Sequence, residues 1–348
     1  MKRMILIDGN SLMYRAYFGI ADTSTLKPNS KGVFTNAIMS FARMMNHILQ
    51  EQFDNILVAF DAGKHTFRHD IMTDYKAGRA HMPEEMRMQI AHIKNLLDLL
   101  GVKRYEVALY EADDIIGTMA KKAEGEGYHV DIYSSDKDLL QLITDNTTVH
   151  LTKKGLTDLE DYTPSHFEEV YGIKVPQFID LKALMGDQSD NIPGVKGIGE
   201  KTALKLLNQY RTIENLKEHM DELKGKMGEK VRTNIELGLL SKKIATIITD
   251  APVELDLDAW KYEGQEYNDD LAEFYRRYDM NSLLKRMSLS TETKQSKPLE
   301  YKIVETLPNI KKNTALIAGV YDTNYHKSAI LGFGLYNKDE AYYISLEN

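Results

Sequence analysis

An acidic cluster that opens a predicted helix offers the clearest chemistry in the chain. Glu111, Asp113 and Asp114 fall just ahead of the apolar run that begins at Ile115. One interpretation is structural, because carboxylates in the first turn of a helix face the positive end of its dipole. The other is metal binding, because oxygen ligands select hard cations such as Mg²⁺ or Mn²⁺.

Further aspartates favour the metal interpretation over simple capping. Each lies where a predicted strand or helix stops, and carboxylates gathered at such stops repel one another unless a divalent cation holds them. These residues are Asp8, Asp61, Asp136, Asp138, Asp187 and Asp190. We therefore predict that they share one metal site with the acidic cluster.

The alternation of strands and helices explains how these acids could meet. It predicts an α/β fold with a mainly parallel central sheet and helices on both faces. Ligands bind such sheets beyond the carboxyl ends of the strands, where Asp8, Asp61 and Asp136 fall. Strands are expected at 3–7, 56–60, 102–107, 128–134 and 148–151, and amphipathic helices at 34–50 and 86–100.

Residues 63–83 form a long polar and basic segment after the second predicted strand. A connection of this length in a compact domain is usually functional or mobile, although a solvated charged loop is the simpler alternative. The segment contains Lys64, Arg68, Lys76 and Arg79 together with Tyr75.

Residues 186–207 predict a helix, a glycine-punctuated hairpin and a second helix. Glycine lets the backbone approach a ligand closely, and the amides that open the second helix suit a phosphate. A plain turn is the alternative, but Gly-x-Gly followed by Lys is typical of a site for the phosphate backbone. The candidate ligands are Lys196, Gly197, Gly199, Lys201, Thr202 and Lys205.

Length and composition suggest two or three domains in 348 residues, 43% of them apolar, without a cysteine. Disulfides and thiolate-bound zinc are excluded, and a cytoplasmic location is expected. No signal peptide or membrane-spanning run is evident. The formal charge of −8 argues mildly against a protein that simply coats nucleic acid.

The pattern divides the chain into four predicted parts. They are an α/β core at 1–170, a helical DNA-binding subdomain at 171–287, a linker at 288–298 and a strand-rich segment at 299–348. The last part is too short to bury enough surface for secure stability alone.

Ordered signatures along roughly the first 290 residues resemble the 5′ nuclease of bacterial DNA polymerase I, a member of the flap endonuclease superfamily. They lie at 6–10 with 14–16, 59–61 with 66–68, 75–79, 110–114, 136–139 and 186–199. Residues 299–348 resemble the start of the 3′–5′ exonuclease-like domain that follows there. An active version would carry an Asp-x-Glu pair, but Asp322 is followed by Thr323 and Asn324, so this part is expected to be inactive and incomplete. The polymerase domain is expected to lie outside this chain.

The resemblance implies two Mg²⁺ (or Mn²⁺) ions, roughly 4 Å apart, that clamp the scissile phosphodiester. The first would be held by Asp8, Asp61, Glu111, Asp113 and Asp114, and the second by Asp136, Asp138, Asp187 and Asp190. Catalytic contacts to phosphates would come from Arg15, Arg68, Lys76 and Arg79. Tyr75 would stack on an unpaired base. Residues 63–83 would form an arch for a 5′ single strand, and the glycine hairpin would hold duplex with a bound K⁺ ion.

The implied function is a structure-specific 5′-3′ exonuclease and 5′-flap endonuclease in Okazaki-fragment processing and DNA repair. Its partner would be DNA with flaps, nicks or duplex ends, held through phosphates that carry no sequence information, by a monomer without membrane contact. One alternative is a non-catalytic DNA-binding scaffold with a structural cation. Another is a metal-dependent phosphatase or a small ribonuclease of the toxin-like nuclease fold, neither of which needs the glycine hairpin or the basic arch.

Overall fold

The computed structural model divides the chain into two compact units, Met1–Leu284 and Lys285–Asn348. It describes residues 1–19, 28–29, 32–154, 158–254, 256–264, 268–291, 301–304, 306, 314–320, 330–336 and 340–346. The predicted loss of an acid pair at 322–324 therefore lies outside the described residues. Within the described part, no helix has the length and apolar character needed to cross a membrane.

A six-stranded sheet forms the centre of the first unit, in the order β3-β2-β1-β4-β5-β6. Its members are β1 (Lys2–Asp8), β2 (Asn55–Ala59), β3 (Arg104–Tyr105), β4 (Tyr128–Ser134), β5 (Thr147–Lys154) and β6 (Asp158–Tyr162). The first five run parallel, and β6 is antiparallel to β5. Residues 4–7 and 56–59 are apolar and buried, as in strands covered on both faces. The predicted mainly parallel sheet is confirmed, with one antiparallel edge strand in addition.

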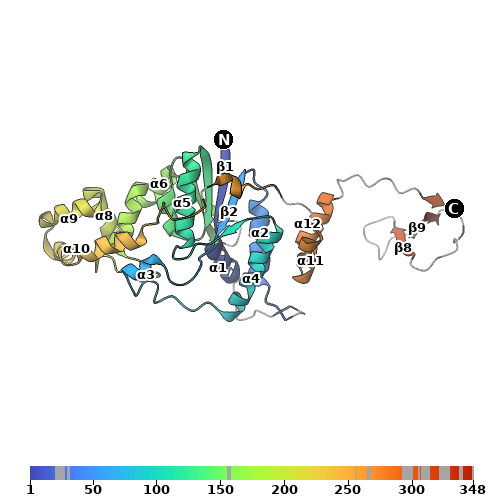
Figure 1. The fold of residues 1–348 in the computed structure, drawn as a ribbon, viewed down its shortest axis with the longest axis horizontal. Coiled ribbons are helices and arrows are strands. Elements are labelled where there is room, and N and C mark those ends of the chain that lie inside the picture. The colour runs from blue at the N-terminus through green and yellow to red at the C-terminus, as the bar shows by residue number, and fades with distance from the viewer. Residues whose placement is uncertain are drawn as a thin grey trace. The chain divides into compact units, whose positions relative to one another are not determined.

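Helices cover both faces of this sheet. α5 (Ala112–Gly125) lies on one side of the strands and α2 (Asn36–Ile48) on the other (Figure 1). α1 (Gly9–Phe18) and α4 (Glu84–Leu99) pack against α2. The apolar side chains of α5, among them Ile115 and Met119, are fully buried in one core with those of the sheet. Burial of this stripe fixes the start of α5, and with it the acidic cluster, relative to the strand ends.

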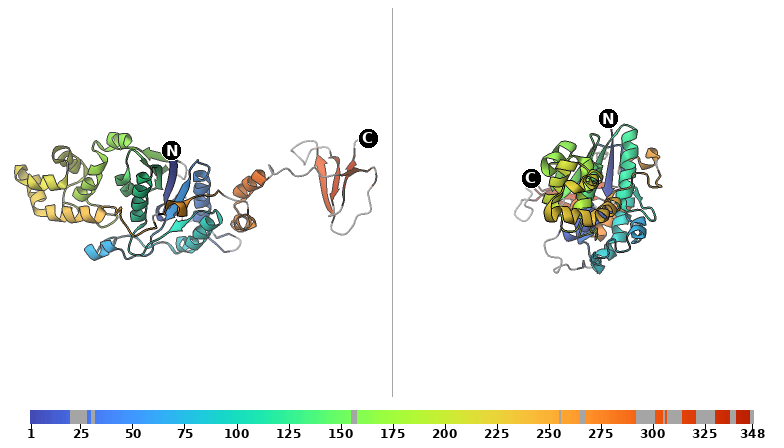
Figure 2. Two further views of the ribbon diagram at one scale, coloured as in Figure 1. Left: turned by 45° about the horizontal axis from the view of Figure 1, so that its top comes forward. Right: turned by 90° about the vertical axis from the view of Figure 1, so that its left-hand side faces the viewer.

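A group of helices gathers on the side of the sheet away from α2, coloured yellow-green to yellow in Figures 1 and 2. It contains α6 (Pro164–Tyr171), α7 (Phe178–Met185), α8 (Glu200–Tyr210), α9 (Ile213–Glu218) and α10 (Gly225–Ala245). α7 is mostly apolar, with Asp180 and Lys182 as its charged residues, and packs against both α8 and α10. This packing sets the position of the loop that follows α7.

The chain then returns to the α/β core instead of extending the helical group. Asn55 Nδ2 donates to the Leu257 carbonyl at 2.5 Å. α11 (Asp269–Arg277) packs against α4, where the Tyr278 hydroxyl lies 2.8 Å from His92 Nδ1. The last part of the predicted helical subdomain at 171–287 thus packs on the α/β core, where it buries the aromatic rings of Tyr275 and Tyr278.

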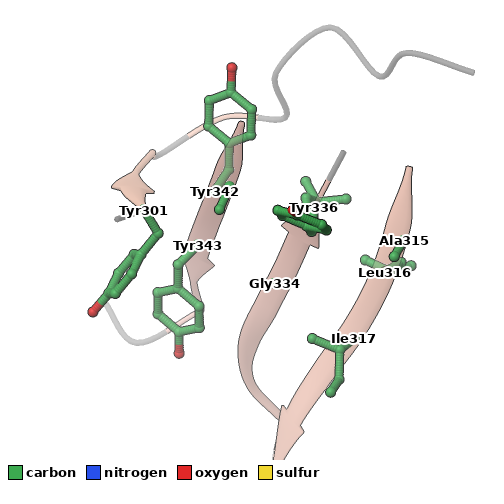
Figure 3. Close-up of a pocket in the computed structure, with 10 residues that line it drawn as sticks. Tyr301, Ala315, Leu316, Ile317, Gly334, Tyr336, Tyr342 and Tyr343 are labelled. Carbon is green, nitrogen blue, oxygen red and sulfur yellow. The ribbon is translucent and has the colours of Figure 1, made fainter. Parts of the chain in front are cut away.

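The second unit begins within α12 (Asn281–Thr291). Residues 288–291, predicted as linker, are helical, because serine and threonine at a helix end cost only tenths of a kcal/mol each, roughly, in propensity. Four strands follow, β7 (Lys302–Ile303), β8 (Ala315–Val320), β9 (Ile330–Tyr336) and β10 (Ala341–Ser345), in the order β7-β10-β9-β8. Apolar side chains such as Leu316 and Ile317 line one hollow of this sheet and are largely exposed (Figure 3), as expected for so small a unit.

Candidate active site

Three acids stand at the carboxyl ends of adjacent parallel strands. Asp8 ends β1 and caps α1, accepting from the Ser11 amide at 2.9 Å. Asp61 follows β2, and Asp136 follows β4 and accepts from the Asp138 amide at 2.9 Å. Because β2, β1 and β4 are neighbours in the sheet, the three residues lie on the rim that the strand pattern predicts.

The start of α5 is fastened to this rim. The Ala112 amide donates to Asp61 Oδ1 at 2.8 Å, so the first turn of the helix meets the end of β2. Asp113 in that turn lies close enough to Asp8 and Asp136 for their charges to act on it. The acidic cluster and the strand ends therefore form one site from four segments.

The pKa values of Asp8 and Asp113 reflect both burial and repulsion between neighbouring carboxylates. Burial, reinforced by the neighbouring charges of Asp136 and Asp61, raises the pKa of Asp8 to about 7. Burial and the charges of Asp8 and Asp136 also raise the pKa of Asp113 well above its usual range. Hydrogen bonds from Ser11 and Ser134 oppose the shift at Asp8 without cancelling it. The rim is thus a place where negative charge is concentrated beyond what its own donors compensate.

Asp8, Asp61, Asp113 and Asp136, here called the acid quartet, make no ion pair with a basic side chain within the described residues. In the same part of the chain, no three His, Asp or Glu side chains are arranged to hold a metal ion as they stand. The donor set nevertheless fits a hard divalent cation: it offers carboxylate oxygens only, and a cation would relieve their repulsion.

The other five predicted metal ligands are paired with basic side chains. The pairs are Asp114 with Arg68, Glu111 with Lys76, Asp190 with Arg79, and Asp138 and Asp187 with Lys182. The nine acids therefore separate into a quartet without basic partners and a set whose charge the chain neutralises itself.

Asp114 and Arg68, predicted as a metal ligand and a phosphate contact, form a buried ion pair with each other in this structure. Arg68 Nη1 and Nη2 donate to the two oxygens of Asp114 at 2.7 and 2.8 Å, and the Arg68 side chain is 3% exposed. Arg68 Nε also donates to the Ile244 carbonyl, and the Ile248 amide donates to Asp114. This pair links α5 to α3 (Phe67–Ile71) and to the end of α10, and it has no access to a ligand.

Tyr75 is also placed differently from the prediction. Its ring is buried, and its hydroxyl lies 3.2 Å from both Glu111 Oε2 and Asp190 Oδ2, so it is not available to stack on a base. Lys76 Nζ donates to Glu111 at 2.8 Å, and Arg79 Nη2 donates to Asp190 at 2.5 Å. The middle of the segment 63–83 therefore lies on the acids, and residues 77–81 are exposed.

The loop that carries Asp187 and Asp190 is closed by two glycines with positive φ, Gly186 (+72°) and Gly194 (+62°). A Cβ on Gly194 would lie 2.3 Å from the Gly186 nitrogen, so the loop ends approach too closely for any side chain. Backbone hydrogen bonds of 2.8 and 2.7 Å join Asp187 and Ile192 in both directions. These contacts close the loop tightly and so fix the positions of Asp187 and Asp190.

Lys182 of α7 is a site residue that the sequence reasoning missed. Its ammonium lies 2.5 Å from Asp138 and 2.6 Å from Asp187. Lys182 and Ser189 outweigh burial and lower the pKa of Asp187 to about 2, whereas burial and Asp136 raise the pKa of Asp138 to about 6 despite Lys182. The sequence does contain a signal for this residue, because Lys182 is a basic residue on the predicted helix directly before the acidic loop.

The predicted phosphate site lies on the exposed hairpin before α8. Gly197 has φ +82°, Gly199 is the N-cap of α8, and Ile198 between them is buried and anchors the turn. Lys196, Lys201 and Lys205 are exposed and Thr202 is partly exposed. Lys230 of α10 adds a further positive charge that was not predicted, and its Nζ donates to the Gly197 carbonyl at 3.1 Å.

Arg15 projects from α1 at the same edge of the sheet. Its Nη2 donates to the Lys153 carbonyl at the end of β5, at 2.5 Å. This hydrogen bond brings the Arg15 guanidinium to the end of β5, and its predicted phosphate contact stays a prediction.

Two family models match the chain in succession. Residues 3–172 match the N-terminal, resolvase-like domain of 5′-3′ exonucleases, and residues 173–268 match the C-terminal SAM fold of the same enzymes. The chain is 46% identical over 351 residues to DNA polymerase I of Bacillus subtilis, covering 99% of this chain and 39% of that protein. It is 41% identical over 287 residues to the thermostable DNA polymerase I of Thermus thermophilus, covering 82% and 33%. The chain thus spans about two fifths of the length of these relatives, or less.

Solved structures show the same fold at low sequence identity. The flap endonuclease of bacteriophage T5, in a complex with DNA and metal ions, is 22% identical with a TM-score of 0.56, covering 83% of this chain and 97% of that one. The catalytic core of Rad2 in complex with a DNA substrate is 16% identical with a TM-score of 0.54, covering 82% and 92%. Because the two family models together account for most of the sequence, and the fold agrees, the chain belongs to the 5′-3′ exonuclease family.

Proposed function

We propose that this chain is a structure-specific 5′ nuclease that hydrolyses DNA phosphodiesters with divalent cations, Mg²⁺ or Mn²⁺, as cofactors. It acts as a 5′-3′ exonuclease and a 5′-flap endonuclease and leaves 5′-phosphate and 3′-hydroxyl ends. The observation that carries the proposal is the acid quartet, which gathers four carboxylates at the end of a parallel sheet, with no basic partner among the described residues. The polymerase relatives extend this to DNA replication and repair.

The acid quartet would hold the first cation, with Glu111 beside it. A divalent cation bound there supplies an activated water and neutralises charge that develops on the phosphodiester. The chain itself contributes the buried Asp8 and three partly buried carboxylates, which keep their position because β1, β2, β4 and α5 are fixed by the core. Asp138, Asp187 and Asp190 are the remaining carboxylates for a second cation.

Lys76 and Arg79 would bind the phosphates near the scissile bond. In this structure Lys76 forms an ion pair with Glu111, and Arg79 forms one with Asp190. When cations occupy the carboxylates, these basic side chains become available for phosphate oxygens, which they recognise by charge and hydrogen bonding. When cations bind, the rim carboxylates would thus exchange their basic partners for cations, and the basic side chains would exchange carboxylates for phosphates.

A labelled 5′-flap substrate tests the proposed activity. Cleavage at the flap junction is expected with Mg²⁺ and none with a chelator, while a fully paired duplex without ends is a poor substrate. Tight binding of the flap without any Mg²⁺-dependent cleavage would instead support the non-catalytic scaffold.

The exposed hairpin would hold duplex DNA by its phosphates, since it presents Lys196, Lys201 and Lys205 beside the amides at the start of α8. K⁺ is a further proposed ligand there, at the backbone of the turn. Replacing Lys196, Lys201 and Lys205 by alanine is expected to weaken duplex binding equally for all sequences. It should also reduce the slope of log affinity against log salt by roughly 2 to 3, about 0.9 for each lost phosphate contact.

The matched control removes three exposed lysines away from the hairpin. Lys2 lies in β1, Lys121 in α5 and Lys261 directly after Trp260, and all three are exposed. Their triple alanine variant has the same net charge change, so it should retain most of the salt slope. An equal loss in both variants would mean that overall charge, and not the hairpin, holds the duplex.

A further inference from the structure

Lys182 places a positive charge inside one half of the carboxylate rim. Its ammonium lies 2.5 Å from Asp138 Oδ1 and 2.6 Å from Asp187 Oδ2. The three side chains are only 14%, 16% and 17% exposed. An ammonium between two half-buried carboxylates occupies the position in which a cation would neutralise both.

The backbone around Lys182 holds this arrangement in place. Lys182 belongs to α7, which buries Phe178, Leu181 and Leu184, and its carbonyl accepts from the Gly186 amide at 2.8 Å. Gly186 opens the closed loop that carries Asp187. Asp138 is fixed separately, at the start of the turn after β4. The ammonium therefore joins two segments that are positioned independently, and it is not a by-product of local helix geometry.

The acid quartet provides the contrast. Asp8, Asp61, Asp113 and Asp136 make no ion pair within the described part of the chain, whereas Asp138 and Asp187 share one lysine. At the quartet, the charge of Lys76 acts on Asp113, but the Lys76 ammonium itself pairs with Glu111. Within the described residues a divalent cation thus meets no ammonium bound to a quartet carboxylate, whereas at the Asp138–Asp187 half it meets one bound to both acids. A divalent cation bound to Asp138 and Asp187 would lie beside the Lys182 ammonium. The repulsion between these two positive charges, in a site partly shielded from water, is large compared with thermal energy.

We propose that Lys182 is a tethered cation that closes the Asp138–Asp187 half of the site to a divalent ion until its ammonium withdraws, so that the acid quartet is loaded first. This inference rests on the proposed function, because it concerns the same metal site. The flexible four-carbon stem lets the ammonium leave without moving α7, and a phosphate of the DNA is then a suitable partner for it. Lys182 is a positioning residue in this scheme.

Binding of Mn²⁺ to the protein without DNA tests the order of loading. The free ion is counted by electron paramagnetic resonance during a titration, which requires no turnover. We expect one tight and one weak ion for the unaltered chain. In Lys182→Met the weak ion should bind at least roughly tenfold more tightly, because the competing charge is gone, while the tight ion is unchanged. Lys182→Arg keeps the charge and should keep the second ion weak.

Lys242→Met is the matched control. Lys242 also bridges two carboxylates, Asp180 at 2.7 Å and Glu214 at 2.8 Å, but both lie outside the rim. This variant loses the same kind of ion pair and should bind Mn²⁺ like the unaltered chain. A tighter second ion in both variants would show a general charge effect and overturn the role of Lys182.

Thermal unfolding with and without Mn²⁺ provides a second test, because the loss of a merely structural lysine would not change the effect of Mn²⁺ on the Tm. In chelator, Lys182→Met should have a lower Tm, because two partly buried carboxylates lose their partner. Mn²⁺ should then raise its Tm by more than it raises that of the unaltered chain. If the second affinity and the Mn²⁺-dependent rise in Tm are both unchanged, the tethered-cation proposal is wrong. If the unaltered chain binds no Mn²⁺ tightly, the proposed metal site itself fails, and this inference fails with it.

Discussion

Flap cleavage in Mg²⁺ is expected to fall by on the order of 10³-fold or more when Asp113 and Asp136 are both replaced by alanine, the scale seen when a preorganised charge-stabilising group is lost. The two residues are half of the acid quartet, and they approach from different segments, α5 and the end of β4. Their loss leaves Asp8 and Asp61 as the only carboxylates without a basic partner in the described rim. Binding of the flap in Ca²⁺, which supports no cleavage, should persist because the exposed hairpin is untouched.

Stability separates this effect from a folding defect. Burial and neighbouring carboxylates raise the pKa of Asp113, so its charged form is disfavoured in the folded protein. Removing this repulsion should stabilise the fold, whereas loss of the Asp136 oxygen that accepts from the Asp138 amide opposes it, so the Tm in chelator should change little. A large fall in Tm would mean that lost cleavage reflects a folding defect and not a lost metal site.

Asp145→Ala with Asp221→Ala serves as the charge-matched control. Both aspartates are exposed and lie outside the rim. The control variant carries the same change in net charge and should cleave normally. Full cleavage by the Asp113→Ala and Asp136→Ala variant would contradict the assignment of the acid quartet to metal binding.

The rim itself could be predicted from the sequence, because it follows from the ends of strands. Asp8, Asp61 and Asp136 each come after a short apolar run, and parallel strands end on a common edge. The rule needs only the local pattern and the sense of each strand. The acidic cluster at the start of α5 could be added because its helix follows another strand of the same sheet.

The division of the acids into a free quartet and a paired set could not be predicted in the same way. Arg68 and Asp114 are 46 residues apart, and Asp138 and Lys182 belong to different parts of the fold. Such pairs depend on where α3 and α7 pack against the core, and no local spacing records this. Tyr75 illustrates the same limit, because a tyrosine in a polar segment looks exposed until its hydroxyl is found between two buried carboxylates.

Arg68→Met is expected to lower the free energy of unfolding by about 3–5 kcal/mol, the usual cost of removing one partner of a buried ion pair. Asp114 is fully buried and would keep its charge without a compensating guanidinium. The carbonyls of Ile244 and Thr246 would also lose their donor. Chemical denaturation monitored by circular dichroism measures the loss.

A double-mutant cycle shows whether the cost belongs to the pair. Adding Asp114→Asn to Arg68→Met removes the stranded charge and should recover part of the lost stability. Arg104→Met is the surface control, because Arg104 pairs with the half-exposed Asp98 and such pairs contribute about 0–1 kcal/mol. If Arg68→Met unfolds like the unaltered chain but no longer cleaves or binds DNA, the phosphate contact predicted for Arg68 from the sequence is right. The structural role assigned to the buried pair would then be wrong, because a guanidinium that reaches the substrate cannot also be the one that fastens α3, α5 and the end of α10 together.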